Sequence, residues 1–285
     1  MPIHPLRVKF KRLRVVRPPL TGYFSIVPVM LFRDFLDFST EKETHSQKKE
    51  SPVKLVTIAG APSAGKTAVT LHLIRQLDKD GKRSAAVKFD TLGTTDDQIY
   101  RERLGIPAIQ GLSDYLCPDH YFVSNLEEAC AWGKKQEVDF LFVETAGLCY
   151  RCAPHVKGVP AITIIDNLGG MEAPRKMGPA LILADVVVVT KSDIVSQAEK
   201  EVFAHRISQV NKTARIVHVN GLTGTGVLHL RRISETWPEA NALEGLSLRY
   251  SMPASICSYC TGETRIGKRF QSGNVEKLLL EENAA

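Results

Sequence analysis

The 285-residue sequence lacks the long apolar run that a membrane-spanning helix requires. Such a helix needs about 18 consecutive apolar residues, and the nearest approach, from Tyr23 to Phe32, is interrupted by Pro28. A basic arm precedes this stretch, as in an export signal, but no convincing small-residue cleavage site follows it. We therefore expect a cytoplasmic protein without a membrane span, whose six cysteines remain reduced.

The sequence also has almost no net charge outside its first fifty residues. Residues 1–50 carry ten Lys and Arg against five Asp and Glu, so they hold five of the six net positive charges of the chain. The remainder is nearly neutral, whereas a nucleic-acid binder needs Lys and Arg clustered on its folded face. We predict no nucleic-acid partner. Residues 1–50 are expected to be a basic, disordered extension, or to follow from a start codon placed before a true start at Met30.

No repeat of fixed period is present, which argues against a solenoid. Instead, β-branched runs alternate with helical patterns from residue 53 onward, as is typical of a parallel sheet covered by helices. We expect strands at 53–59, 84–90, 139–144, 161–166, 185–190 and 215–220, and helices at 66–79, 125–135, 173–183, 197–210 and 226–235. The prediction is an α/β fold with a doubly wound, mainly parallel sheet over 51–240 and a small cysteine-containing segment over 241–285.

A phosphate-binding loop is predicted between the first strand and the first helix. The pattern needs glycines so that backbone N–H groups can turn toward the phosphates, a lysine for the β- and γ-phosphate oxygens, and a hydroxyl for Mg²⁺. The N-terminus of the helix adds its positive dipole end. The predicted loop consists of Gly60, Ala61, Pro62, Ser63, Ala64, Gly65, Lys66 and Thr67.

Two acidic residues at strand ends are candidates for holding Mg²⁺ or positioning water. Glu144 begins the sequence Glu-Thr-Ala-Gly, which resembles the Asp-x-x-Gly switch, so Gly147 is predicted to sense the γ-phosphate. Asp90 ends its own strand and is the second candidate. We expect hydrolysis to depend on Lys66 and Mg²⁺ for charge neutralisation, and on Thr67 with Asp90 or Glu144 for metal positioning.

The base of the nucleotide is predicted to lie against residues 190–193. The sequence Thr-Lys-Ser-Asp is close to the Asn-Lys-x-Asp element of GTPases, in which the lysine lies along the base and the aspartate accepts hydrogen bonds from guanine. Lys191 and Asp193 therefore favour GTP. Thr190 stands in place of the asparagine, so ATP remains the alternative.

Taken together, these motifs resemble the HypB/UreG branch of the SIMIBI-type P-loop GTPases, with CobW-type proteins as relatives. The loop over 60–67, Asp90, Glu144 with Gly147, residues 190–193 and the glycine-rich stretch 220–226 carry the resemblance, which covers about residues 53–235. It implies a homodimer that uses GTP hydrolysis to deliver nickel, cobalt or zinc, or to assemble a metal centre, in a client metalloenzyme or together with its accessory proteins. It also implies a metal-binding cysteine loop after the switch.

Two Cys-x-x-Cys pairs are candidate metal ligands: Cys149 with Cys152, and Cys257 with Cys260. Each supplies half of a tetrahedral site, and together they would make a four-thiolate zinc or iron–sulfur site. His155 is an open candidate for a further ligand, whereas Cys130 is expected to pack within a helix. The second pair could instead be a structural zinc knuckle. An ATP-dependent iron–sulfur electron-transfer protein, of the kind exemplified by the nitrogenase iron protein, is the alternative function.

Overall fold

The computed structural model describes residues 52–149, 152–252 and 262–278. These residues all lie in one compact unit, Lys48–Ala285. The predictions for residues 1–50 and for Cys257 and Cys260 fall outside the described residues, and the division of the chain at residues 50 and 240 remains a prediction. Within the described part of the chain, no helix is both long and apolar enough to span a bilayer.

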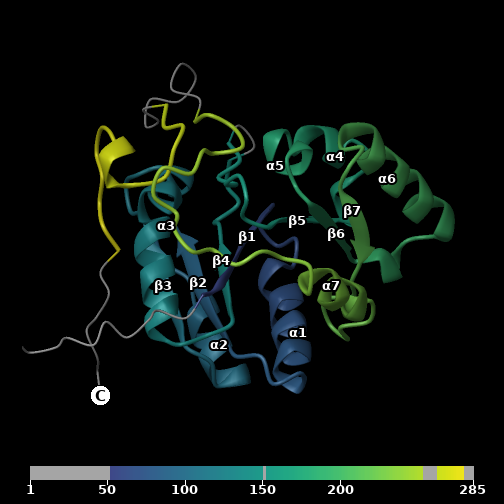
Figure 1. Cartoon of the computed structure of the whole chain (residues 1–285). Coiled ribbons are helices and arrows are strands. Elements are labelled where there is room, and N and C mark those ends of the chain that lie inside the picture. Colours follow the sequence, from purple (N-terminus) through teal and green to yellow (C-terminus); the bar gives the residue numbers. More distant parts are fainter. Residues whose placement is uncertain (1–51, 150–151, 253–261, 279–285) are drawn as a thin grey trace, which may run out of the picture. The chain divides into compact units, whose positions relative to one another are not determined.

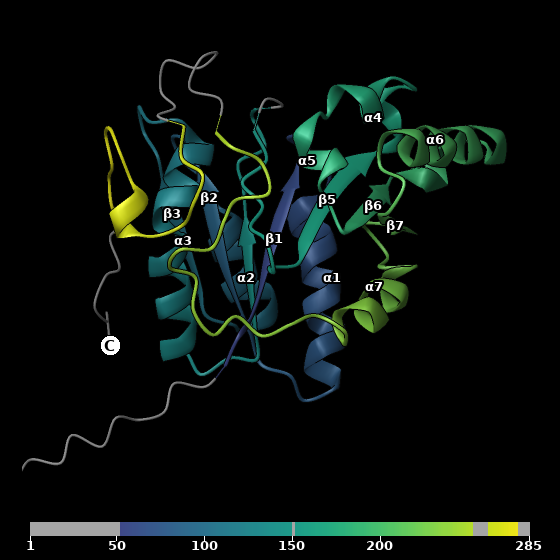
Figure 2. The same ribbon diagram turned by 45° about the horizontal axis from the view of Figure 1, so that its top comes forward.

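Seven strands form one sheet in the order β3-β2-β4-β1-β5-β6-β7 (Figure 1). Every neighbouring pair in this sheet is parallel, and the strand arrows rise toward one edge in Figure 2. The predicted doubly wound parallel sheet is confirmed. The strands are β1 (Lys54–Gly60), β2 (Ser84–Asp90), β3 (Ala108–Leu112), β4 (Phe140–Glu144), β5 (Ala161–Asp166), β6 (Val186–Thr190) and β7 (Arg215–His218).

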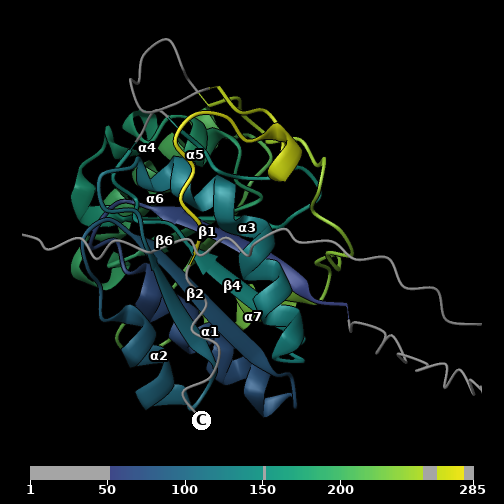
Figure 3. The ribbon, with the colours of Figure 1, turned by 90° about the vertical axis from the view of Figure 1, so that its left-hand side faces the viewer.

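Helices cover both faces of the sheet. One face packs against α1 (Lys66–Lys79), α2 (Asp96–Leu104) and α7 (Val227–Ser234). The other packs against α3 (Pro118–Lys135), α4 (Ala173–Lys176), α5 (Pro179–Ile182) and α6 (Gln197–Val210). Figure 3 shows α2 and α3 on opposite sides of the sheet. Successive residues of a strand point to opposite faces of the sheet. Because the buried strand residues on both faces are apolar, each face packs against its own helices.

The differences from the predicted elements have local causes. The single helix expected at 173–183 is two short helices, because Gly178 has a φ of 54° and Pro179 starts a new helix. Helix α3 begins at Pro118 rather than near 125, since proline suits the first turn of a helix. Strand β3 and helix α2 were not predicted: the first is short, and the second is strongly polar.

The described residues of the C-terminal segment pack against the α3 face. Leu243, Leu248, Met252, Ile266 and Leu278 are buried in the same core cluster as Phe122 and Leu126 of α3. At the other end of this segment, the backbone N–H of Ala240 donates to the carbonyl of Val53 at 2.7 Å. The segment therefore gains its core from the main domain, as a piece of this size must.

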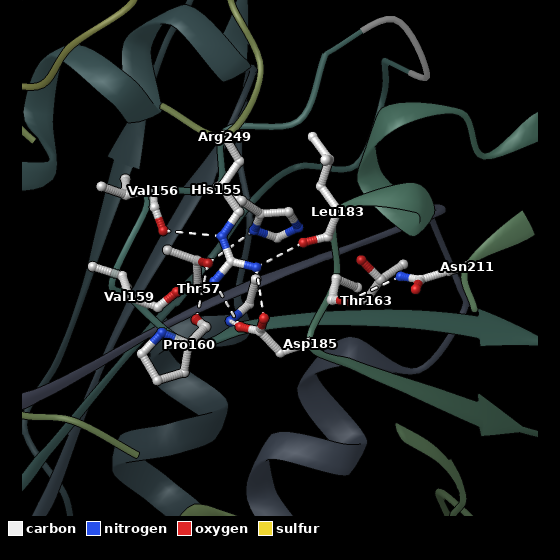
Figure 4. A network of polar contacts seen from close by, with 12 residues as sticks. Thr57, His155, Val156, Val159, Pro160, Thr163, Leu183, Asp185, Asn211 and Arg249 are labelled. Atoms are coloured by element: carbon white, nitrogen blue, oxygen red, sulfur yellow. Dashed lines mark hydrogen bonds and ion pairs between the residues drawn. The ribbon is translucent and has the colours of Figure 1, made fainter. Parts of the chain in front are cut away.

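Arg249 joins this segment to the amino ends of β5 and β6 (Figure 4). Its two terminal nitrogens donate to the two carboxylate oxygens of Asp185 at 2.7 and 2.6 Å. Its remaining donors reach three backbone carbonyls at 2.7–3.1 Å, those of Val156, Val159 and Leu183. We call Arg249, Asp185, His155 and Thr57 the amino-end network. It fixes the loop that leads from Cys152 to β5.

Candidate nucleotide and metal sites

The loop between β1 and α1 has the backbone that a phosphate cradle needs. Gly60 has a φ of 150°, and a Cβ there would lie 2.3 Å from the carbonyl oxygen of Ile164. Gly65 caps α1 with a φ of 93°. An L side chain would be strained at either position. The loop thus presents the N-terminus of α1 at the carboxyl edge of the sheet, where parallel α/β proteins bind ligands.

Lys66 is folded back onto this loop. Its ammonium group donates to the carbonyls of Gly60 at 3.0 Å, Ala61 at 3.1 Å and Ala146 at 3.4 Å. Burial, and then the nearby charge of Lys88, lowers the pKa of Lys66 to about 8, against the opposing effect of the surrounding acids. A buried ammonium group held by neutral carbonyls is a strong receptor for an anion, because a phosphate would supply a charged partner. The arrangement fits a bound triphosphate.

Glu144 lies at the centre of a second group of polar side chains. Its Oε2 atom accepts a hydrogen bond from Thr67 Oγ1 at 3.1 Å and lies 3.5 Å from Lys88 Nζ. Its Oε1 atom accepts from the hydroxyl of Tyr100. Lys88 Nζ also lies 2.8 Å from Asp96 Oδ2. We call these five residues the phosphate-side cluster, because Thr67 belongs to the phosphate loop.

The sheet register places Lys88 beside Glu144. The two residues are partners across the parallel pair β2–β4, so their side chains point to the same face. Burial lowers the pKa of Lys88, but Glu144 and Asp96 outweigh it, so the pKa is raised. Burial raises the pKa of Asp96, but Lys88 outweighs it, so the pKa is lowered. Neither Lys88, Asp96 nor Tyr100 was predicted from the sequence.

Asp90, the other predicted acid, is not part of the phosphate-side cluster in the described structure. It is the last residue of β2, and its Oδ1 atom accepts a hydrogen bond from the backbone N–H of Thr91 at 2.8 Å. Its charge still raises the pKa of Lys66 against the stronger effect of burial. Asp90 therefore borders the phosphate loop, whereas Glu144 contacts Thr67 directly.

The predicted base-binding residues line a cavity of about 190 Å³ beside the phosphate loop. Lys191 and Asp193 follow β6, and the opposite wall consists of Ala68 of α1 and residues 220–222 after β7. The hydroxyl of Thr190 donates to the carbonyl of Ala64 at 2.6 Å, so the residue that replaces asparagine ties β6 to the phosphate loop. Ala64 and Gly65 of the phosphate loop line this cavity, so the cavity lies directly beside the phosphate loop.

Three further side chains converge behind the phosphate loop. Ligand atoms of Asp119, Cys149 and Cys152 all lie within 4.8 Å of one another, and the two sulfur atoms are 4.0 Å apart. The three side chains line one pocket together with Gly60 and Gly147. Burial raises the pKa of Asp119 to about 7, against a smaller opposing effect of Lys66. We call Asp119, Cys149 and Cys152 the cysteine cluster.

The cysteine cluster has the dimensions of a metal site. A tetrahedral metal with bonds of about 2.3 Å to sulfur holds two thiolates about 3.8 Å apart, close to the separation seen here. Asp119 was not predicted, although its position directly after Cys117 and Pro118 placed a carboxylate beside a cysteine. His155 lies elsewhere: its Nδ1 atom is 2.9 Å from the hydroxyl of Thr57. Cys130 is a buried residue of α3 and packs in the core, as predicted.

Gly147 connects the cysteine cluster to the phosphate loop. Its φ is 80°, and a Cβ there would lie 1.9 Å from the carbonyl oxygen of Gly60 and 2.9 Å from Lys66 Nζ. One residue, Leu148, separates it from Cys149. A change in the loop at Gly60 or Lys66 would therefore be transmitted to the cysteine-bearing segment by direct contact.

Comparison with known proteins agrees with the motifs. A family model described as the CobW/HypB/UreG nucleotide-binding domain matches residues 54–218. Over 226 residues the chain is 45% identical to "Uncharacterized protein MJ0120" of Methanocaldococcus jannaschii, an alignment that covers 79% of this chain and 96% of that protein.

Solved structures show the same fold at low sequence identity. HypB of Archaeoglobus fulgidus, a hydrogenase maturation factor, is 20% identical with a TM-score of 0.52, covering 64% of this chain and 89% of that one. HypB of Helicobacter pylori, solved in complex with nickel, is 17% identical with a TM-score of 0.53, covering 67% and 92%. At these identities the likeness establishes the fold alone.

Proposed function

The chain belongs to the CobW/HypB/UreG family of nucleotide-binding domains, and from this premise we propose that it hydrolyses GTP and couples hydrolysis to the delivery of a transition metal. The cargo would be nickel, cobalt or zinc, held by the cysteine cluster. Family membership does not favour the alternative of an ATP-dependent iron–sulfur electron-transfer protein.

One observation carries the proposal: residues of the cysteine cluster and of the phosphate loop line the same pocket. Gly60 and Gly147 line the same pocket as Asp119, Cys149 and Cys152. Since Gly147 also abuts Lys66, loss of the γ-phosphate would change the contacts on which Cys149 depends. Hydrolysis would then alter the affinity of the cysteine cluster for its metal.

The residues of the phosphate site have separable roles in this proposal. Bound Mg²⁺ would neutralise phosphate charge, and Thr67 with Glu144 or Asp90 would hold it. Lys66 leaves the loop carbonyls to contact the β- and γ-phosphate oxygens, and Gly147 contacts the γ-phosphate through its N–H. In the structure, Glu144 contacts Thr67, and Gly147 lies against Lys66. Asp90 is close enough to Lys66 to raise the pKa of that ammonium group.

The cavity beside the phosphate loop supports GTP rather than ATP. Asp193 lines it, and a carboxylate can accept hydrogen bonds from the two N–H groups on the edge of guanine, which adenine does not offer in that arrangement. We expect Asp193→Asn to lower the affinity for GTP while leaving ATP binding unchanged. Tighter binding of ATP than of GTP by the wild-type protein would instead assign the site to ATP.

The proposal includes a homodimer that acts in the cytoplasm on a client metalloenzyme or its accessory proteins. Two copies would bring two cysteine clusters into one assembly, which suits a metal that needs four ligands. Sedimentation of the purified protein with and without a non-hydrolysable GTP analogue would test this part directly. A protein that stays monomeric in both conditions would contradict it.

The central test is metal binding measured under two nucleotide states. Equilibrium dialysis against Ni²⁺, Co²⁺ or Zn²⁺ would compare the wild type with Cys149→Ser, Cys152→Ser and Asp119→Asn, using Cys130→Ser as the matched control. We expect the three cluster variants to lose binding and the control to keep it. A non-hydrolysable GTP analogue should change the affinity of the wild type.

Several outcomes would contradict the proposal. If the metal affinity is the same with GTP, with the analogue and without nucleotide, the nucleotide site and the cysteine cluster are not coupled. Retention of metal by all three cluster variants, with loss in a Cys257→Ser/Cys260→Ser double variant, would assign the ligands to the second cysteine pair. A brown, reducible protein after anaerobic purification would favour the iron–sulfur alternative.

A further inference from the structure

The carboxylate of Glu144 is held almost entirely by other side chains. Its exposed fraction is 0%, so water does not compensate its charge. Tyr100 donates to one oxygen, and Thr67 and Lys88 meet the other. A carboxylate removed from water needs a cation nearby, because desolvation of an unpaired charge costs several kcal/mol. Lys88, itself 5% exposed, is the cation that contacts Glu144 in the described structure.

Lys88 is shared unequally between two acids. Its ammonium nitrogen lies 2.8 Å from Asp96 but 3.5 Å from Glu144. Asp96 stands at the start of α2, and its side chain is 24% exposed, so water reaches this acid but not Glu144. The longer ion pair can therefore be given up while the shorter one persists, and Lys88 does not become an unpaired buried charge.

The oxygen of Glu144 that faces Lys88 is also the one that faces the phosphate loop. Oε2 accepts the hydrogen bond from Thr67, whose hydroxyl is the group a phosphate loop offers to Mg²⁺. A bound cation and the ammonium group of Lys88 would thus approach the same oxygen. Both carry positive charge, and two like charges that approach one buried oxygen repel each other strongly.

We propose that Lys88 is a positioning residue of the magnesium site, which serves as the counter-ion of Glu144 in the nucleotide-free protein and withdraws onto Asp96 when Mg²⁺ and nucleotide are bound. This inference rests on the proposed nucleotide function and is independent of the cysteine cluster. Asp96 sets the Mg²⁺ concentration that nucleotide binding requires, because it determines how easily Lys88 releases Glu144.

The two members of the pair have opposite predicted effects on Mg²⁺. Lys88→Met removes the cation that contacts both carboxylates and leaves only the more distant charge of Lys66, so the nucleotide-free protein itself should attract Mg²⁺. Asp96→Asn leaves Lys88 with Glu144 as its charged partner, so Lys88 should hold that carboxylate more firmly. Lys88→Arg keeps the charge and should restore the wild-type behaviour. Lys82→Met serves as the control, since Lys82 forms an exposed ion pair with Asp139.

The test combines two measurements on the full-length protein. The first is the thermal midpoint without nucleotide, with and without millimolar Mg²⁺. We expect Mg²⁺ to raise the midpoint of Lys88→Met and to leave that of the wild type and Lys82→Met unchanged. The second is the Mg²⁺ concentration for half-maximal binding of a fluorescent GTP analogue. It should fall at least about threefold in Lys88→Met and rise at least about threefold in Asp96→Asn.

The outcomes distinguish this inference from the proposed function. If the wild type binds nucleotide with Mg²⁺ but the two variants shift the Mg²⁺ requirement in the same direction or not at all, the inference is wrong and the proposed function stands. If the wild type binds no nucleotide, the proposed function fails. Should Lys88→Met not fold, Asp96→Asn alone decides the matter, since an unchanged or lowered Mg²⁺ requirement in that variant overturns the inference.

Discussion

Opposite ends of the sheet carry two charged networks that differ in how completely their charges are matched. In the amino-end network, one arginine meets one carboxylate through two short contacts, and its other donors are taken by backbone carbonyls (Figure 4). In the phosphate-side cluster, one lysine serves two acids at unequal distances. The first network leaves Arg249 without a spare donor. The second has one negative charge in excess and a hydroxyl, that of Thr67, aimed at it.

The difference separates a structural network from a functional one. A fully matched network stabilises one conformation, because any movement of Arg249 breaks several hydrogen bonds at once. An under-compensated pair of acids at the mouth of a phosphate loop is stable only while a cation remains close, which makes it responsive to cations. Both networks contain ion pairs, so an ion pair alone does not identify the site; the Lys88–Glu144 pair is buried, whereas the carboxylate of Asp185 is 48% exposed.

The largest expected effect is the loss of stability on replacing Arg249. Arg249→Met would leave three partly buried backbone carbonyls without their donor, whereas water would solvate the half-exposed carboxylate of Asp185. We therefore expect the free energy of unfolding to fall by about 3 kcal/mol, mainly through the carbonyls. Urea denaturation measures this, and the Mg²⁺ requirement for nucleotide binding should not change. Arg269→Met is the control, because Arg269 forms an exposed ion pair with Glu244 on the same segment. Equal losses in both variants would remove the distinction between the networks.

A smaller effect on stability, joined to an effect on function, is expected for Tyr100. Tyr100→Phe removes the hydroxyl that donates to Glu144 inside a site without solvent, which should cost about 2 kcal/mol of unfolding free energy. Because Glu144 then loses one of the contacts that orient it toward Thr67, GTP hydrolysis should also slow. Tyr115→Phe is the matched control, since Tyr115 is 91% exposed. A variant that loses stability with unchanged hydrolysis would make Tyr100 a purely structural residue.

The sequence was sufficient for six of the seven strands and for the phosphate loop, because these depend on local patterns. Helices α1 and α6 were predicted with their observed bounds, the latter supported by a capping box between Ser196 and Glu199. The order of the strands, however, depends on pairing between distant segments. Strand β3 has only five residues, with a glycine among them, and carries little periodic signal.

The site residues that were missed are those defined by packing across strands. Lys88 gave one signal, a charged residue inside an otherwise apolar strand, but its partners Glu144 and Asp96 lie 56 and 8 residues away and meet it only through the β2–β4 register and the start of α2. Asp119 was missed for a similar reason, because α3 was predicted to begin later and its first turn was not placed beside Cys149.

The smallest expected effect concerns the pH dependence of the amino-end network. Burial, and then the charge of Arg249, lowers the pKa of His155 to about 3, whereas its ordinary value is 6.5. The folded protein therefore keeps His155 neutral while the unfolded chain binds a proton below pH 6.5, so stability is complete above that pH and falls as the solution is acidified. Between pH 7.5 and 5.5 the loss from this residue should be about 1.4 kcal/mol. Urea denaturation at both pH values, with His155→Asn as the reference, separates the contribution of His155 from that of other titrating groups. An identical pH dependence in the two proteins would mean that His155 accepts a proton without leaving its place beside Thr57, and that the amino-end network is less closed than its contacts indicate.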